Sequence, residues 1–211
     1  MYKIPTYDDV REEWSYTFFS NKAELIEFML PLFKEPGKYN FDKTSLEFNK
    51  QARHYDTHGV FCFAPEGTKD FMDYWNAEKE KCRNGVIYKN NKNTWYLTRD
   101  YYMWINFLPL YNKEVNKFTF PDIRDAQYHM ALYEYLGQLN NKHAAILKKR
   151  QIASSYYHAG KIINLWWFEE GAVLKMAGSL KDYISEKGTW RYLEEYRNFL
   201  NQHTAWYRPS N

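Results

Sequence analysis

The stretch HAAILKKRQIASSYYHAGKIINLWWF, residues 143–168, constrains the fold of this chain more than any other. Its apolar run, residues 144–147, has the length of a buried strand, and three consecutive cations follow at 148–150. Ala153 and two serines then open a segment whose apolar residues recur at helical spacing. The order of strand, basic loop and helix is typical of a phosphate-binding loop, in which a helix N-terminus and cations hold the anion.

The residues after this stretch extend the pattern. A helix is predicted over 154–170, and a second buried strand is predicted over GAVLKMAG, residues 171–178. Two strands joined by one helix form a βαβ unit, which implies a parallel sheet. We therefore expect an α/β fold with a partial parallel sheet.

A mostly helical α+β region is expected ahead of this unit, so we divide the chain into residues 1–120 and 121–211. Helices are predicted over three amphipathic stretches, residues 21–33, 68–84 and 120–140. Thr68 can cap the second of these helices and Gly85 can end it. The sequence GVIYKNNKNTWYLT, residues 85–98, predicts a β-hairpin.

Composition excludes several classes of protein. Hydrophobic residues make up 45% of the chain and charged residues 26%, which indicates a globular protein. The net charge of +3 is too small to argue nucleic-acid binding by itself. Cys62 and Cys82 form no CxxC motif, which argues against a metal site and a disulfide framework. No apolar run approaches the ~20 residues of a membrane span.

Aromatic residues are unusually frequent, at 20% of the chain, and this has two interpretations. They can form a tyrosine-rich core, or they can provide a surface on which nucleic-acid bases stack. The histidines, His143 and His158 among them, have no partner at catalytic spacing and are interpreted as structural or exposed.

The basic loop does not match the standard phosphate-binding pattern GxxxxGK[ST]. With Ser155 at the last position, Lys148 and Ala153 stand where the two glycines belong, and Ser154 replaces the lysine. The chemistry can still be assembled from what is present. Alanine is the smallest side chain after glycine, and the Ser155 hydroxyl can ligate Mg²⁺.

The cations of the loop can supply the charge that the missing lysine would carry. Lys148 and Lys149 can reach phosphates from the strand side, and the forked guanidinium of Arg150 can pair with terminal phosphate oxygens. The alternative interpretation is that residues 148–150 form a solvated turn.

At this point the residues resemble a known family. ILKKRQIASSYYHA, residues 146–159, resembles the deviant Walker A loop of phage terminase large subunits, the motors that pump DNA into capsids. Many of those loops read K-x-R-Q-x-G-x-S, and the matching residues here are Lys148, Arg150, Gln151, Ala153 in place of glycine, and Ser155. FPDIRDAQYHM, residues 120–130, is similar to the stretch that carries an adenine-contacting glutamine, here Gln127.

Two upstream segments, residues 59–88 and 94–111, also resemble the region that precedes the motor in these terminases, so the likeness covers roughly residues 40–208. The resemblance implies a sheet of the P-loop NTPase type, with ATP and Mg²⁺ as cofactors. It implies nucleotide binding by Gln127, Lys148, Lys149, Gln151, Ala153, Ser154 and Ser155, Mg²⁺ at Ser155, and catalytic charge stabilisation by Arg150.

The implied whole protein is a virus-encoded ATPase and endonuclease that couples ATP hydrolysis to DNA translocation in the host cytoplasm. Its implied partners are double-stranded DNA, the terminase small subunit, the portal protein and further copies in a ring, with no membrane. No acidic Walker B pair is visible, because Glu169 and Glu170 are interpreted as the last turn of the preceding helix. We therefore expect an N-terminal part that binds ATP but hydrolyses it poorly.

A second hypothesis uses the same residues without an enzyme. In it, the chain is a non-enzymatic module that binds nucleic acid or protein through the basic loop and an aromatic surface.

Overall fold

The computed structural model describes residues 15–35, 47–90, 93–112, 115–148, 152–178, 181–185 and 188–209. Its helices are α1 (Lys22–Lys34), α2 (Lys50–His58), α3 (Lys69–Asn84), α4 (Arg99–Phe107), α5 (Asp125–Leu139), α6 (Ser154–Phe168), α7 (Lys181–Ile184) and α8 (Thr189–His203). Its strands are β1 (Ser15–Thr17), β2 (Val86–Lys89), β3 (Thr94–Leu97), β4 (Leu110–Asn112) and β5 (Lys117–Thr119). The described protein is a mostly helical α+β fold.

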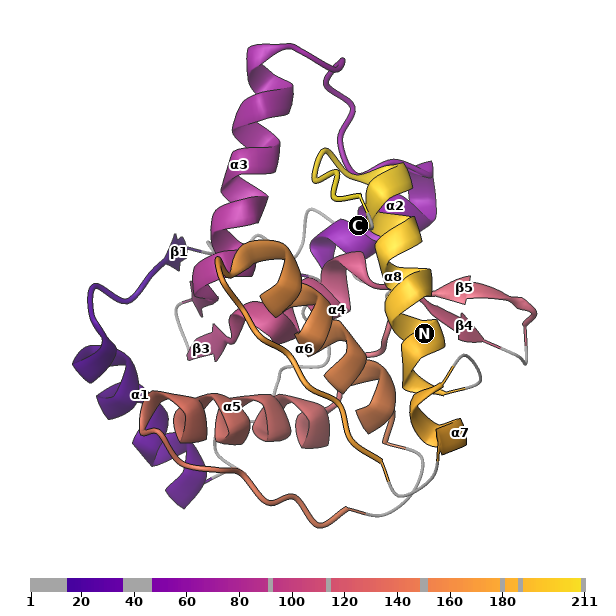
Figure 1. Cartoon of the computed structure of the whole chain (residues 1–211). Helices are drawn as coiled ribbons and strands as arrows, with labels where there is room; N and C mark the ends of the chain where they lie inside the picture. Colours follow the sequence, from indigo (N-terminus) through magenta and orange to yellow (C-terminus); the bar gives the residue numbers. More distant parts are fainter. Residues whose placement is uncertain are drawn as a thin grey trace, which may run out of the picture.

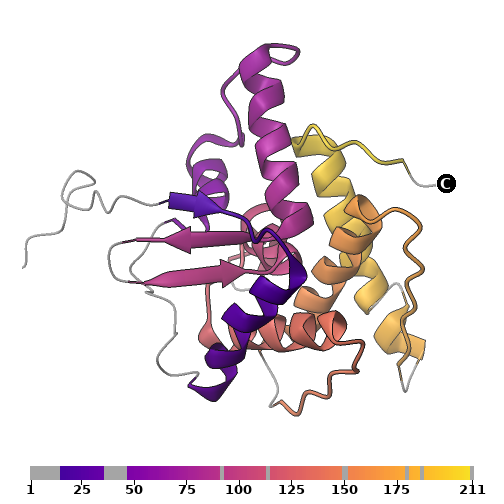
Figure 2. The same cartoon turned by 90° about the vertical axis from the view of Figure 1, so that its left-hand side faces the viewer.

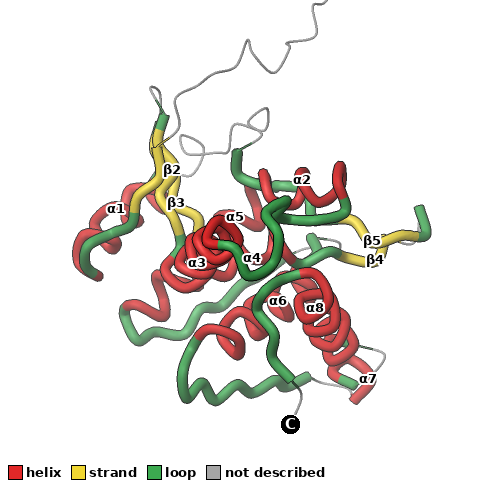
Figure 3. The backbone as a smooth tube through the Cα atoms, turned by 90° about the horizontal axis from the view of Figure 1, so that it is seen from above, coloured by secondary structure: helices red, strands yellow, loops and turns green. Residues whose placement is uncertain are grey.

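The sheets are small, antiparallel and peripheral. Strands β1, β2 and β3 form one sheet in that order, and β4 pairs with β5 in the other. The two sheets lie on opposite sides of the molecule, with the helices between them (Figures 1 and 3). Figure 2 shows the three-stranded sheet beside α1 and below the projecting end of α3.

The predicted parallel βαβ sheet was wrong. Within the described residues, 142–148 and 172–178 form no strand, and the side chains of Leu147 and Val173 are exposed. A four-residue apolar run is buried as a strand only when other strands pair with it and a second layer covers it. Helix α6 packs instead against α4 and α8 (Figure 1).

The upstream hairpin and its helix follow the sequence prediction. Thr68 caps α3 by accepting a hydrogen bond at its Oγ1 from the amide of Phe71, at 3.3 Å. Gly85 ends the helix at a φ of 71°, which glycine adopts without strain. Strands β2 and β3 then pair from Val86–Leu97 to Lys89–Thr94.

The core is built around α4, in which every residue from Asp100 to Phe107 is buried. Helices α2, α3, α5 and α6 all contact it. Much of the core is aromatic. Trp104 and Tyr157, for example, are fully buried and meet edge-to-face with their ring centroids 5.5 Å apart. This burial favours the core interpretation of the aromatic content and counts against a base-stacking surface.

Among the residues that the structure describes, no helix combines the length and apolar content that crossing a membrane requires.

Candidate functional site

The start of α6 follows a left-handed residue and has no side-chain cap. Ala153, the residue before the helix, adopts a left-handed conformation with φ 54° and ψ 22°, and no side chain caps the helix. The first amides of a helix have no partner within it, and they carry the positive end of the helix dipole. The loops that this stretch resembles have glycine at the position of Ala153, and the backbone conformation found there is one that glycine favours.

Gln127 reaches this turn from α5. Its side chain is 2% exposed, and its Nε2 donates a hydrogen bond to the main-chain oxygen of Ile152 at 2.9 Å. Its Oε1 is buried and accepts no hydrogen bond in the described structure. The structure therefore brings Gln127 and the Ala153 turn together, and it leaves a buried acceptor unused beside them.

The other predicted site residues divide into three groups. Ser154 is the first residue of α6 and is buried, whereas Ser155 is exposed. Lys148 is exposed in a segment without regular structure, so no strand fixes its position relative to the helix. The predictions for Lys149, Arg150 and Gln151 lie outside the described residues.

Sequence reasoning missed an ionic cluster beside this turn. Glu134 on α5 accepts hydrogen bonds from two α6 cations: its Oε1 lies 2.6 Å from His158 Nε2, and its Oε2 lies 2.7 Å from Lys161 Nζ. His158 Nδ1 lies 2.7 Å from the main-chain oxygen of Ser154 and 3.2 Å from its Oγ. The cluster links α5 to the first turn of α6.

The available signal for this cluster was periodicity. Gln127 and Glu134 are seven residues apart and so share one face of α5, as His158 and Lys161, three residues apart, share one face of α6. The spacing shows which side chains lie together on each helix, but it does not show that the two faces meet.

The pKa values of the cluster follow from its contacts. Burial disfavours the charged form of Glu134, but hydrogen bonds and charges from His158 and Lys161 outweigh it, so the pKa of this carboxyl is lowered. Burial also opposes the charge on His158, but the bond and charge of Glu134, helped by the Ser154 carbonyl, raise the pKa of the imidazole.

Ser154, His158 and Glu134 do not form a hydrolytic triad, although the residue types match one. A triad histidine must offer an unprotonated nitrogen to the serine hydroxyl. Here Nε2 faces a carboxylate and Nδ1 faces a main-chain oxygen, and both are acceptors. Nδ1 lies closer to the Ser154 carbonyl, at 2.7 Å, than to the Ser154 hydroxyl, at 3.2 Å, and the pKa of His158 is raised, so the contacts favour a charged ring and an ionic cross-link.

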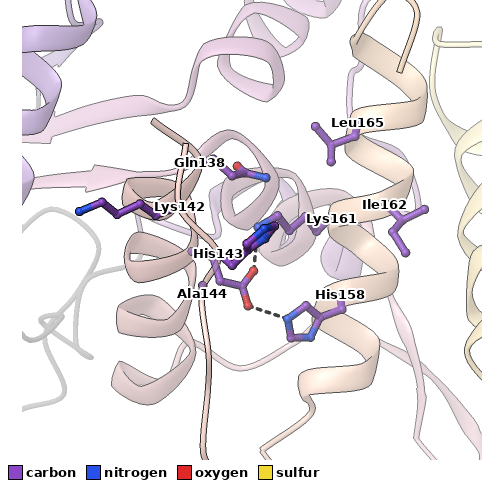
Figure 4. Close-up of a pocket in the computed structure, with 9 residues that line it drawn as sticks. Gln138, Lys142, His143, Ala144, His158, Lys161, Ile162 and Leu165 are labelled. Atoms are coloured by element: carbon purple, nitrogen blue, oxygen red, sulfur yellow. Dashed lines mark hydrogen bonds and ion pairs between the residues drawn. The ribbon is translucent and has the colours of Figure 1, made fainter. Parts of the chain in front are cut away.

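An open cavity of ≈ 340 Å³ borders the cluster. Its lining residues are Glu134, Gln138, Lys142, His143, Ala144, His158, Lys161, Ile162 and Leu165. Figure 4 shows His158 and Lys161 directed from α6 toward the cavity, whereas Lys142 points away from His158. The local charge is positive, because one carboxylate faces several basic groups.

A metal ion at this site would need the phosphates of a bound nucleotide to complete its coordination. The described part of the chain holds no group of three or more His, Cys, Asp or Glu side chains that could bind one. Mg²⁺ is commonly held by few protein oxygens together with nucleotide phosphates and water, so the Ser155 hydroxyl remains a candidate ligand. Glu169 does not belong to this site, because it follows the last turn of α6 and pairs with Arg99 at 2.6 Å.

Comparisons with protein-family models, with curated proteins and with solved structures found no match to this chain.

Proposed function

We propose that the chain binds ATP with Mg²⁺ at the start of α6. In this proposal it is the N-terminal part of a viral DNA-packaging terminase large subunit, which couples ATP hydrolysis to DNA translocation. One observation carries the proposal: Gln127 is bonded to the carbonyl of Ile152, next to the left-handed Ala153, at an uncapped helix start. Gln127, to which the resemblance assigns adenine, therefore lies beside Ala153, to which it assigns phosphate.

The phosphate end of the ligand would lie against the first amides of α6, where the helix dipole favours an anion. Ser155 is exposed at this end and is proposed to contact Mg²⁺. Lys148 is proposed to add a cation from the preceding segment. Lys149, Arg150 and Gln151 enter the proposal from the sequence alone.

The adenine end would lie near Gln127. A buried acceptor without a donor costs about 1–3 kcal/mol, so a base that donates to Oε1, once the enclosed side chain of Gln127 is exposed to it, removes a penalty present in the free protein. The exocyclic amine of adenine is such a donor, whereas guanine carries a carbonyl oxygen at the same ring position. The proposal therefore includes a preference for ATP over GTP.

The proposal for this chain alone is binding rather than rapid turnover. The sequence offers no acidic pair at the end of a strand to polarise the attacking water, and in the proposed whole protein such a group would do so. Double-stranded DNA, the small subunit, the portal and further copies in a ring are proposed as partners of that whole protein.

The binding proposal is tested by thermal unfolding with and without MgATP. At about ten times Kd, the ligand should stabilise the chain by about 1.4 kcal/mol, which raises Tm by about 3–6 °C at this chain length. Lys148→Ala should reduce or abolish the rise. Lys142→Ala removes an exposed cation from the same segment and should leave the rise unchanged.

Two results would count against the proposal: no rise in Tm at millimolar MgATP, or an equal rise in Lys148→Ala and wild type. A smaller rise with MgGTP than with MgATP is expected if Oε1 of Gln127 reads the base. Equal rises with both nucleotides would remove that assignment and leave only phosphate binding.

A further inference from the structure

The ionic cluster of Glu134, His158 and Lys161 contacts the proposed nucleotide site at Ser154, the first residue of α6. His158 follows Ser154 by four residues, which is about one helical turn, and its ring returns to the main-chain oxygen and hydroxyl of Ser154. Its other nitrogen is held by Glu134 on α5. The residue thus connects the first helical residue of the site to a neighbouring helix.

The geometry matches the charged form of His158. A neutral imidazole donates a hydrogen bond from only one nitrogen, whereas the imidazolium donates from both. The Glu134 carboxylate and the Ser154 carbonyl both accept, so a neutral ring would leave one of these contacts without a proton. Loss of the proton therefore weakens the link to Glu134, or it replaces the bond to the Ser154 carbonyl by a longer contact in which the Ser154 hydroxyl, at 3.2 Å, donates to Nδ1.

We infer that His158 is a positioning residue whose positive charge strengthens nucleotide binding at the start of α6. The inference rests on the proposed function, and it assigns the site a pH dependence. The imidazolium holds the first turn against α5, and it adds a positive charge close to the helix end that receives the phosphates. Deprotonation removes both contributions.

The sign follows from the contacts. Glu134 raises the pKa of His158 above that of a free imidazole. The ring is therefore charged at pH values below the free pKa, and it loses its charge as the pH rises through the raised pKa. Nucleotide affinity should therefore be higher on the acid side of this transition and should fall on the alkaline side. The expected change is about two- to fivefold, as for a single charge near a helix N-terminus.

Other charged groups near His158 can be separated from it. Lys161 shares the Glu134 carboxylate, and Lys142 and His143 line the same cavity from the segment after α5. His143 is the other histidine that lines this cavity, so His143→Gln is the matched control.

The test measures the MgATP dissociation constant by calorimetry between pH 6 and pH 9 for wild type, His158→Gln, Glu134→Gln and His143→Gln. The ratio of the variant's dissociation constant to that of wild type at each pH cancels the effect of the titration of the nucleotide itself. His158→Gln should weaken binding about two- to fivefold at pH 6 and show little difference from wild type at pH 9. His143→Gln should follow the wild-type profile throughout.

Glu134→Gln provides a second variant that keeps an oxygen acceptor for Nε2. Without the carboxylate charge, the pKa of His158 should fall, so the affinity transition should move to lower pH. The NMR titration of the His158 ring proton should show the same displacement.

The two levels of proposal fail differently. If wild type binds MgATP but His158→Gln keeps the full pH profile, the role of His158 is overturned while the proposed function stands. If wild type does not bind MgATP at any pH, the proposed function fails and this inference fails with it.

Discussion

Ala153 is a small residue in a conformation that side chains rarely adopt. Its φ of 54° places it in the left-handed region, which is less favourable than the right-handed helical region by about 1–2 kcal/mol for residues other than glycine. The turn is retained because Gln127 holds the carbonyl of Ile152 on one side and α6 begins on the other. A strained residue held by its neighbours at a helix start is consistent with a site that binds anions.

We predict that Ala153→Gly stabilises the chain by about 0.5–1 kcal/mol, because glycine adopts this conformation without the Cβ penalty. The greater conformational freedom of glycine in the unfolded chain offsets only part of this gain. It should not weaken MgATP binding. Ala159→Gly is the matched control: Ala159 is buried inside α6, and its loss should destabilise the chain by about 1 kcal/mol. Urea unfolding measures both, and destabilisation by Ala153→Gly would contradict the assignment of strain.

Single residues also show how far the sequence could predict the site. Gln127 was singled out by the resemblance, and the structure places it on α5 with its side chain bonded to the main-chain oxygen of Ile152. Glu134 and His158 were missed, because their pairing depends on how α5 and α6 meet in space. Helical spacing places residues on one face of a helix, but tertiary packing decides what that face contacts.

At the scale of elements, a buried amide helps to hold α6 in place. Asn164 is 1% exposed, and its Nδ2 donates hydrogen bonds to the main-chain oxygens of Cys82 at 2.8 Å and of Arg99 at 3.4 Å. The carbonyl of Cys82 belongs to the last turn of α3, where carbonyls have no partner within the helix. Asn164 therefore joins α6 to the end of α3 and to the start of α4.

We predict that Asn164→Ala destabilises the chain by about 1–3 kcal/mol, because buried carbonyls lose their donor. Asn164→Asp should destabilise it more, since the carboxylate offers no donor and brings a buried charge. Asn198→Ala changes an exposed amide on α8 and should remain within about 0.5 kcal/mol of wild type. Urea midpoints rank the three variants, and equal effects of Asn164→Ala and Asn198→Ala would contradict this role.

Elements differed in how well the sequence predicted them. Helix α3 was predictable because Thr68 and Gly85 mark its two ends locally. The hairpin was predictable because its two strands are neighbours along the chain. The strands proposed at 143–148 and 171–178 were wrong, since an apolar run becomes a strand only through partners that lie elsewhere in the fold.

At the scale of the whole molecule, the candidate site borders the aromatic core. Tyr157, in the first turn of α6, belongs to the buried cluster, and Ala153 packs against it, while α5 lies beside the start of α6 (Figure 1). The fold therefore presents the site from two helices that are already anchored, α6 through α4 and α8, and α5 through α1. Ligand binding there should affect a restricted set of residues rather than the entire chain.

The most direct test of the account is the response of individual backbone amides to MgATP, measured by two-dimensional NMR on the labelled chain. We predict that the largest chemical-shift changes fall on Ser154, Ser155 and Tyr156 at the start of α6 and on the side-chain amide of Gln127. The amides of β4 and β5, which form a separate two-stranded sheet, should not respond. Unchanged amides at the start of α6 under millimolar MgATP, or changes spread evenly over the chain, would contradict the account.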